Sequence, residues 1–140
     1  MSGSLVDLWK DAIQTSPHKS RPLHNLGYSY AQQKHDSAAI IYVQKALQMN
    51  PASVHSQITL AQYYIRNQQY VQSIAEYQEL FRLEKRYPHW DWGEIGFQAY
   101  YELGQLFTQL KRWQEALPLL QEALSRHQEK LEIHELLGKV

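Results

Sequence analysis

Histidine is the residue of this 140-residue chain best suited to chemistry, because imidazole binds metals and transfers protons, and seven are present. No cysteine accompanies them, so thiolate metal sites and disulfides are excluded. His24 and His55 fall in different sequence repeats, and His89 with Asp91 is an isolated pair, so neither combination has the spacing of a metal site. The sequence also shows no arrangement of Ser, His and Asp typical of a catalytic triad, no glycine-rich loop that could bind phosphate, and no isolated pair of carboxylates that could act as general acid and base. We therefore expect no metal, no cofactor and no enzyme activity in this chain itself.

A second chemically distinctive segment, residues 87–93, gathers Tyr87, Trp90 and Trp92 beside His89 and Asp91. This is more aromatic surface than a connecting loop needs, so the segment is a candidate for a second contact patch. Alternatively, Trp90 and Trp92 pack against neighbouring helices and cover core that an insertion would expose. The sequence leaves both interpretations open.

The charge balance argues against polyanionic partners. Fourteen Lys and Arg residues offset fourteen Asp and Glu residues, so the basic excess typical of nucleic-acid or membrane-surface binding is missing. No apolar run approaches the roughly 20 residues that span a bilayer, which predicts no membrane insertion. Residues 1–4 look like a cloning remnant rather than a targeting signal, and the lack of cysteine leaves the compartment open.

The elements that position these side chains are predicted to be helices almost throughout. Only six glycines and five prolines occur, and Gln, Leu, Ala, Glu and Tyr fill long stretches without apolar-polar alternation. Helix breaks are expected at Ser16-Pro17, at Asn50-Pro51 and in residues 87–93. Pro118 lies inside a predicted helix and should cost one backbone hydrogen bond. The sequence thus predicts an all-α fold.

The helices are organised as repeats. A Leu followed by a small residue recurs at spacings of 34, 43 and 34 residues, as Leu26-Gly27, Leu60-Ala61, Leu103-Gly104 and Leu137-Gly138. Such a period is typical of a solenoid, in which each unit buries its apolar face by stacking on its neighbours. The longer spacing indicates a nine-residue insertion. Counting from Pro51 divides residues 5–140 into a half repeat at 5–19, repeats at 20–53, 54–96 (insertion at about 86–96) and 97–130, and a truncated repeat at 131–140.

These units resemble the tetratricopeptide repeat, whose pattern sets large, small and aromatic residues and a proline at fixed offsets. The first full unit supplies Leu23, Leu26, Gly27, Tyr30, Ala39, Val43, Ala46 and Pro51. The third supplies Tyr100, Leu103, Gly104, Phe107, Ala116, Leu120 and Ala123, but has Gln128 in place of the proline. The second is weaker, because Gln57, Ala61, Ser73 and Lys85 depart from the pattern, and its second helix is expected to overrun. The resemblance covers nearly the whole chain and implies a right-handed α-solenoid of antiparallel helix pairs.

The resemblance also implies a binding surface, because the first helix of each unit lines the concave face in this family. The inward positions form a peptide-binding set: Arg21, His24, Tyr28, Gln32, His55, Gln62, Arg66, Gln98, Tyr101, Gln105 and Gln109, with Ile58 in the same register. Gln amides would hydrogen-bond a peptide backbone, Tyr rings would offer apolar area, and the two arginines would bind a carboxylate. Alternatively, these are ordinary solvated residues, since Gln and Arg are good helix formers. The Lys and Asn clamp of chaperone-binding relatives is missing, because His24 and Tyr28 stand in its place.

The sequence therefore predicts a scaffold or adaptor that binds a protein or peptide and is a fragment of a larger protein. One alternative is the regulatory or positioning tail of a larger enzyme, such as a membrane glycosyltransferase, because residues 8–13 and the prolines after them are similar to the junction in such enzymes. Another is homodimer formation through the terminal helix, where Ile133, Leu136, Leu137 and Val140 have no following helix to cover them.

Overall fold

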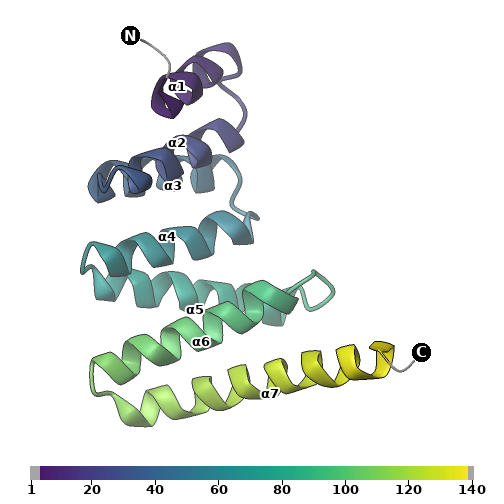
Figure 1. The fold of residues 1–140 in the computed structure, drawn as a ribbon. Helices are drawn as coiled ribbons and strands as arrows, with labels where there is room; N and C mark the ends of the chain where they lie inside the picture. Colours follow the sequence, from purple (N-terminus) through teal and green to yellow (C-terminus); the bar gives the residue numbers. More distant parts are fainter. Residues whose placement is uncertain (1–3, 139–140) are drawn as a thin grey trace. The chain divides into compact units, whose positions relative to one another are not determined.

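The computed structural model describes residues 4–138, with side chains up to Glu129. All regular structure in this range is helical: α1 (Leu5–Thr15), α2 (Arg21–Gln32), α3 (Asp36–Met49), α4 (Val54–Arg66), α5 (Tyr70–Arg86), α6 (Gly93–Gln109) and α7 (Trp113–Gly138). The all-α prediction is therefore confirmed. The chain divides into two compact units, Met1–Glu76 and Tyr77–Val140, and α5 contributes to both. Figure 1 shows α2 with α3, and likewise α6 with α7, as antiparallel pairs joined by short turns.

The turn that follows the first helix of each pair has the same backbone conformation. Lys34, Gln68 and Lys111 have positive φ angles of 62°, 59° and 60°. After α2, the N–H of His35 bonds the carbonyl of Tyr30 at 2.9 Å, and the N–H of Lys34 bonds that of Ala31 at 3.0 Å. This pair of bonds is a Schellman motif, and it recurs after α4 and after α6. The period of the sequence, 34 and then 43 residues, is therefore also a period of the backbone.

Local signals fix the helix ends in the first unit. α3 ends at Met49, before Asn50-Pro51, as the sequence predicts. Pro22 lies in the first turn of α2, where its missing N–H costs nothing. At the start of α4, the hydroxyl of Ser53 accepts a hydrogen bond from the N–H of Ser56 at 3.2 Å.

The last helix is long. α7 carries Pro118 in its interior, as expected, and is one continuous helix from Trp113 to Gly138. The reason is local, because Gln128 is a good helix former and stands where the first unit has its terminating proline. The side chains proposed for dimer formation, Ile133 to Val140, lie outside the described side chains.

Small residues let α2 and α3 approach closely in the first unit. A Cβ added at Gly27 would lie 2.7 Å from a methyl carbon of Val43 and 3.0 Å from the carbonyl oxygen of Ala39. Leu26, Ala39 and Val43 are all fully buried at this contact. Only a residue without a side chain fits at position 27, which explains the Leu-Gly pair that defines the repeat.

The departures of the second repeat from the pattern are compensated by hydrogen bonds. The hydroxyl of Ser73 donates to the carbonyl oxygen of Ala61 at 2.8 Å, and both residues are fully buried. The buried amide of Gln57 donates to the carboxylate of Glu76. Polar groups at these core positions therefore have partners, which removes most of their desolvation cost. The predicted overrun is also present, since α5 has 17 residues and α3 has 14.

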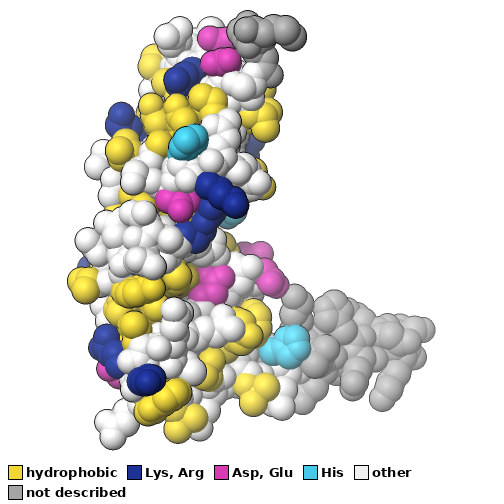
Figure 2. Space-filling view, turned by 60° about the vertical axis from the view of Figure 1, so that its left-hand side comes forward, with side chains coloured by type: hydrophobic (Ala, Val, Ile, Leu, Met, Phe, Trp, Pro, Cys, Tyr) yellow, Lys and Arg dark blue, Asp and Glu magenta, His cyan; other side chains and the backbone are white. Residues whose placement is uncertain are grey.

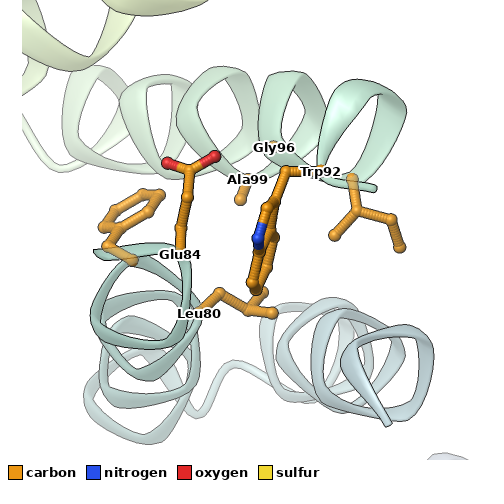
Figure 3. A pocket seen from close by; sticks show the side chains of 7 residues that line it. Leu80, Glu84, Trp92, Gly96 and Ala99 are labelled. Atoms are coloured by element: carbon orange, nitrogen blue, oxygen red, sulfur yellow. The ribbon is translucent and has the colours of Figure 1, made fainter. Parts of the chain in front are cut away.

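The aromatic segment before α6 is folded onto the second unit. The rings of Tyr87 and Trp90 stack at 4.4 Å, and those of Trp90 and Trp92 lie 5.9 Å apart. Trp92 is buried, and its indole N–H donates to the carbonyl oxygen of Tyr87 at 2.7 Å. Figure 3 shows its ring reaching from the start of α6 toward Leu80 of α5. Trp92 is thus part of the core, whereas Tyr87 and Trp90 are half-buried.

Candidate functional site

The inward positions of the first unit lie on α2 and α4, the first helices of the two repeats there. Arg21, His24 and Tyr28 share one face of α2, because they are three and four residues apart. Arg21 and Tyr28 are exposed, and His24 is half-buried. Gln32 is exposed at the end of α2, and Gln62 of α4 is half-buried. Ile58 differs from the expected exposure, since it is 2% exposed and belongs to the core.

A histidine pair joins the beginnings of α2 and α4. The rings of His24 and His55 lie 4.8 Å apart with a tilt of 37°, and His24 Nδ1 is 3.0 Å from the hydroxyl oxygen of Ser56. Ser56 in turn accepts a hydrogen bond from the hydroxyl of Ser53 at 3.2 Å. Burial, and then the charge of His55, lower the pKa of His24 below its usual value. The neutral form of His24 is therefore favoured in the folded chain, and His24 gains its charge only at a lower pH than usual.

Arg66 joins the opposite ends of these helices. Its Nη2 donates to the carbonyl oxygen of Ala31 at 3.0 Å and lies 3.1 Å from Oδ1 of Asp36. The guanidinium also lies over the ring of Tyr63, 5.7 Å from the centroid. Burial raises the pKa of Tyr63, and the charge of Arg66 partly opposes that rise. Arg66 was predicted as a carboxylate ligand for a partner, and in the structure its guanidinium already binds a carboxylate of this chain.

The inward positions of the second unit lie along α6. Tyr101, Gln105 and Gln109 are exposed, and Gln98 is half-buried. The ring of Phe97 stacks on that of Tyr101 at 5.7 Å and also contacts His127 of α7 at 5.6 Å. These rings form an aromatic surface beside the glutamines. Because stacking already restricts the side chain of Tyr101, this residue loses less conformational entropy when a ligand binds.

An ion cluster in the second unit was not predicted from the sequence. Arg126 of α7 donates to both carboxylate oxygens of Glu84 at 2.6 and 2.8 Å and to Glu122 at 2.9 Å. Its guanidinium lies 4.5 Å from the centroid of the Tyr100 ring. A Cβ at Gly96 would collide with Arg126, so this glycine leaves room for the ion pair against α6. Tyr100 belongs to the repeat pattern but Glu84, Glu122 and Arg126 do not, and the pairing of residues 84 and 126 has no local sequence signal.

The described side chains do not favour metal binding or a deep ligand cavity. Up to Glu129, they contain no group of three or more His, Cys, Asp or Glu residues that could hold a metal ion. The crevice around Trp92 in Figure 3 is filled by its own apolar lining, including Leu80, Ile95 and Ala99. Figure 2 shows basic, acidic and apolar side chains interspersed on the visible face, without a large area of one charge. None of the helices described for residues 4–138 is long and apolar enough to cross a membrane.

Comparison with protein families decides the classification. Two tetratricopeptide repeat models match, one over residues 58–130 and one over residues 20–53, and the first covers more than half of the chain. The chain belongs to the tetratricopeptide repeat family. Its fold class is the all-α solenoid of antiparallel helix pairs that the sequence predicts. Tetratricopeptide repeat proteins generally bind proteins or peptides, so the chain is a protein-interaction scaffold in this general sense.

Solved structures agree with the tetratricopeptide repeat fold. Two crystal structures of MamA superpose with TM-scores of 0.79 and 0.75, each at 17% identity over 91% of this chain. A human IFIT1 dimer with PPP-AAAA superposes with a TM-score of 0.76, at 20% identity over 88% of this chain. The chain spans 69% and 64% of the MamA chains and 29% of the IFIT1 chain. Comparison with curated proteins gives no match.

Proposed function

We propose that the chain is an adaptor whose first helices bind an extended peptide or a partner surface. The observation that carries this proposal is the two-ended link between α2 and α4, made by His24 with Ser56 and by Arg66 with Ala31. Both ends of the surface are fixed before a partner arrives, so little ordering cost is expected on the scaffold side. Tyr28 is exposed between these two links, and Arg21 and His55 are exposed beside the link made by His24.

The face of α6 is the proposed contact surface of the second unit. Tyr101 is 43% exposed and held by stacking on Phe97, which supports a role as a flat apolar contact. Gln105 and Gln109 follow at intervals of one helical turn and can pair with the N–H and C=O groups of a peptide. Nη2 of Arg66 is already engaged by Asp36 and Ala31, so Arg21 is the more available cation.

Affinity capture with matched variants tests this function. The chain and the double variant Arg21→Ala, Tyr28→Ala are used to capture partners from lysate of the source cells, with folding verified by circular dichroism. Ile41→Ala is the control, because Ile41 is 49% exposed on α3 and lies outside the inward set. Loss of a partner with the double variant but not with the control supports the proposal. If all three proteins retain the same partners, the assignment of partner binding to this surface is refuted.

Self-association is a second candidate function with its own observation. Trp113, Leu117 and Leu124 of α7 are 60%, 59% and 57% exposed, which is unusual for three large apolar residues of one helix. Sedimentation that shows a strict monomer at high concentration would exclude it. The repeat boundaries, including the half repeats at 5–19 and 131–140, and the enzyme-tail alternative are also proposals, and a membrane-spanning stretch encoded upstream of residue 1 would support the enzyme tail.

A further inference from the structure

The balanced net charge of the chain conceals an uneven distribution. Between Asp11 and Glu76, Asp36 is the only acidic residue. The same stretch holds five Lys and Arg residues and four histidines, namely Lys19, Arg21, Lys34, Lys45, Arg66, His18, His24, His35 and His55. The single carboxylate is already paired with Arg66. The helices α2 and α4 themselves carry Arg21, His24, His55 and Arg66 and no acidic residue.

We propose that the partner segment bound by α2 and α4 is acidic, and that Arg21, His24 and His55 receive its carboxylate. The inference rests on the proposed function and specifies its partner. Charge complementarity carries it, because Arg21, His24 and His55 lie at the beginnings of α2 and α4, two helices that carry no acidic residue. The two histidines are in direct ring contact, and Arg21 precedes His24 by one turn on the same face of α2.

The geometry also indicates what should follow the acidic residue. Tyr28 lies one helical turn beyond His24, about 6 Å along the axis. It lies close enough to Tyr63 to affect the pKa of that buried ring. Two residues of extended peptide span about 7 Å. A segment with an acidic residue at one position and a large apolar residue two positions later therefore matches the histidine pair and then Tyr28.

Binding of a carboxylate here should be linked to proton uptake. His24 has a lowered pKa because it is half-buried and faces His55. The charged residues of α1, which are Asp7, Lys10 and Asp11, do not contribute to this shift of the His24 pKa. On α2 the neighbours of His24 on the same face are Arg21 and Tyr28. The carboxylate of Asp36 on α3 is paired with Arg66. A bound carboxylate favours imidazolium and opposes both causes of the shift. Affinity should therefore increase as the pH falls from 7.5 to 5.5, where a glutamate is still ionised.

The test uses two blocked peptides, acetyl-Gly-Ala-Glu-Ala-Leu-Ala-Gly-amide and its Gln counterpart, titrated into the protein by isothermal titration calorimetry at pH 5.5 and 7.5. We expect the Glu peptide to bind about five-fold more tightly than the Gln peptide at pH 5.5, as one charge-assisted contact allows, and less so at pH 7.5. The double variant His24→Gln, His55→Gln should lose the pH dependence, and Arg21→Gln should weaken the preference for Glu. His35→Gln, on an exposed residue outside both units' inward sets and at the other end of α2, is the control and should behave as the unmodified chain.

The outcomes separate this inference from the function on which it rests. Equal binding of both peptides that is lost in Tyr28→Ala would refute the acidic partner and support the peptide-binding surface. A pH dependence that persists in the double histidine variant would also refute the inference. Binding of neither peptide, or tighter binding of an adenylate hexanucleotide than of the Glu peptide, would overturn it, whereas the capture experiment would still decide the adaptor function.

Discussion

Arg126 and Glu84, 42 residues apart in sequence, form a bidentate ion pair with donor-acceptor distances of 2.6 and 2.8 Å. Their side chains are only 25% and 19% exposed, so the pair is shielded from solvent more than a surface salt bridge. Hydrogen bonding to Glu84 raises the pKa of Arg126. The pair connects α7 to α5 within the second unit.

Replacing Arg126 by Lys should therefore destabilise the second unit although it keeps the charge. Lys cannot donate in the fork that matches a carboxylate, and it loses the stacking on Tyr100. We expect a loss of about 1–2 kcal/mol in the free energy of unfolding, measured by urea denaturation. Arg82→Lys is the control, since the Arg82 and Glu79 pair is exposed, and it should leave the transition unchanged. Equal effects of the two substitutions would contradict a special role for Arg126.

Gly27→Ala and Gly104→Ala should differ although both glycines occupy the same repeat position. An added methyl gains about 1 kcal/mol of helix propensity at either site. At Gly27 it meets a β-branched Val43 and the backbone of Ala39, which cannot move aside, so overpacking should exceed that gain by about 1–2 kcal/mol. At Gly104 it meets mainly the flexible side chain of Leu120, and the net change should be smaller. Thermal unfolding followed by circular dichroism measures both, and a larger loss for Gly104→Ala would refute this explanation.

Lys111→Gly should stabilise the protein. Lys111 has a φ of 60°, and a left-handed conformation costs a residue with a Cβ about 1 kcal/mol that glycine does not pay. We expect a gain of about 0.5–1 kcal/mol in the free energy of unfolding, because glycine also loses more entropy on folding. Lys111→Val, which is β-branched, is the opposite control and should destabilise. A destabilised glycine variant would mean that the Lys111 side chain makes contacts that outweigh the backbone strain.

The repeat period made the fold predictable, whereas the side-chain partners of the candidate site were not. Leu26, Gly27, Ala39 and Val43 recur because close helix packing requires those sizes at those spacings, so the sequence pattern and the packing carry the same information. Arg66 shows what the repeat pattern does not predict. Its position implied a free guanidinium, but its pairing with Asp36 depends on how two repeats meet, which no local pattern encodes. The net charge of zero likewise concealed the basic excess between Asp11 and Glu76, because it averages over the chain.

Stability should fall as the solution becomes more acidic, and His24 should contribute to that change. Its pKa is lowered in the folded state from an ordinary value of 6.5, so the unfolded chain binds the proton more readily. The stability that depends on neutral His24 is fully present above pH 6.5 and is lost as the pH falls below 6.5. The free energy of unfolding then decreases by at most about 1.4 kcal/mol per pH unit for one proton. His24→Gln should flatten the pH dependence of the urea midpoint between about pH 7 and pH 5. An unchanged slope in this variant, with His89→Gln as control, would assign the acid sensitivity to another group.

Substitution of the two tryptophans before α6 separates packing from binding in the aromatic segment. Trp92 is 7% exposed, its indole donates to the carbonyl of Tyr87, and its ring lies against Leu80 and Ala99. Trp92→Ala should therefore cost about 3–5 kcal/mol, the range for removal of a buried aromatic ring. Trp90 is half-buried and stacks between Tyr87 and Trp92, so Trp90→Ala should cost markedly less. If Trp90→Ala retains the fold by circular dichroism and the captured partners remain, the segment serves packing alone. Loss of a partner with a folded Trp90→Ala variant would instead establish the contact patch that Tyr87 and Trp90 are placed to form.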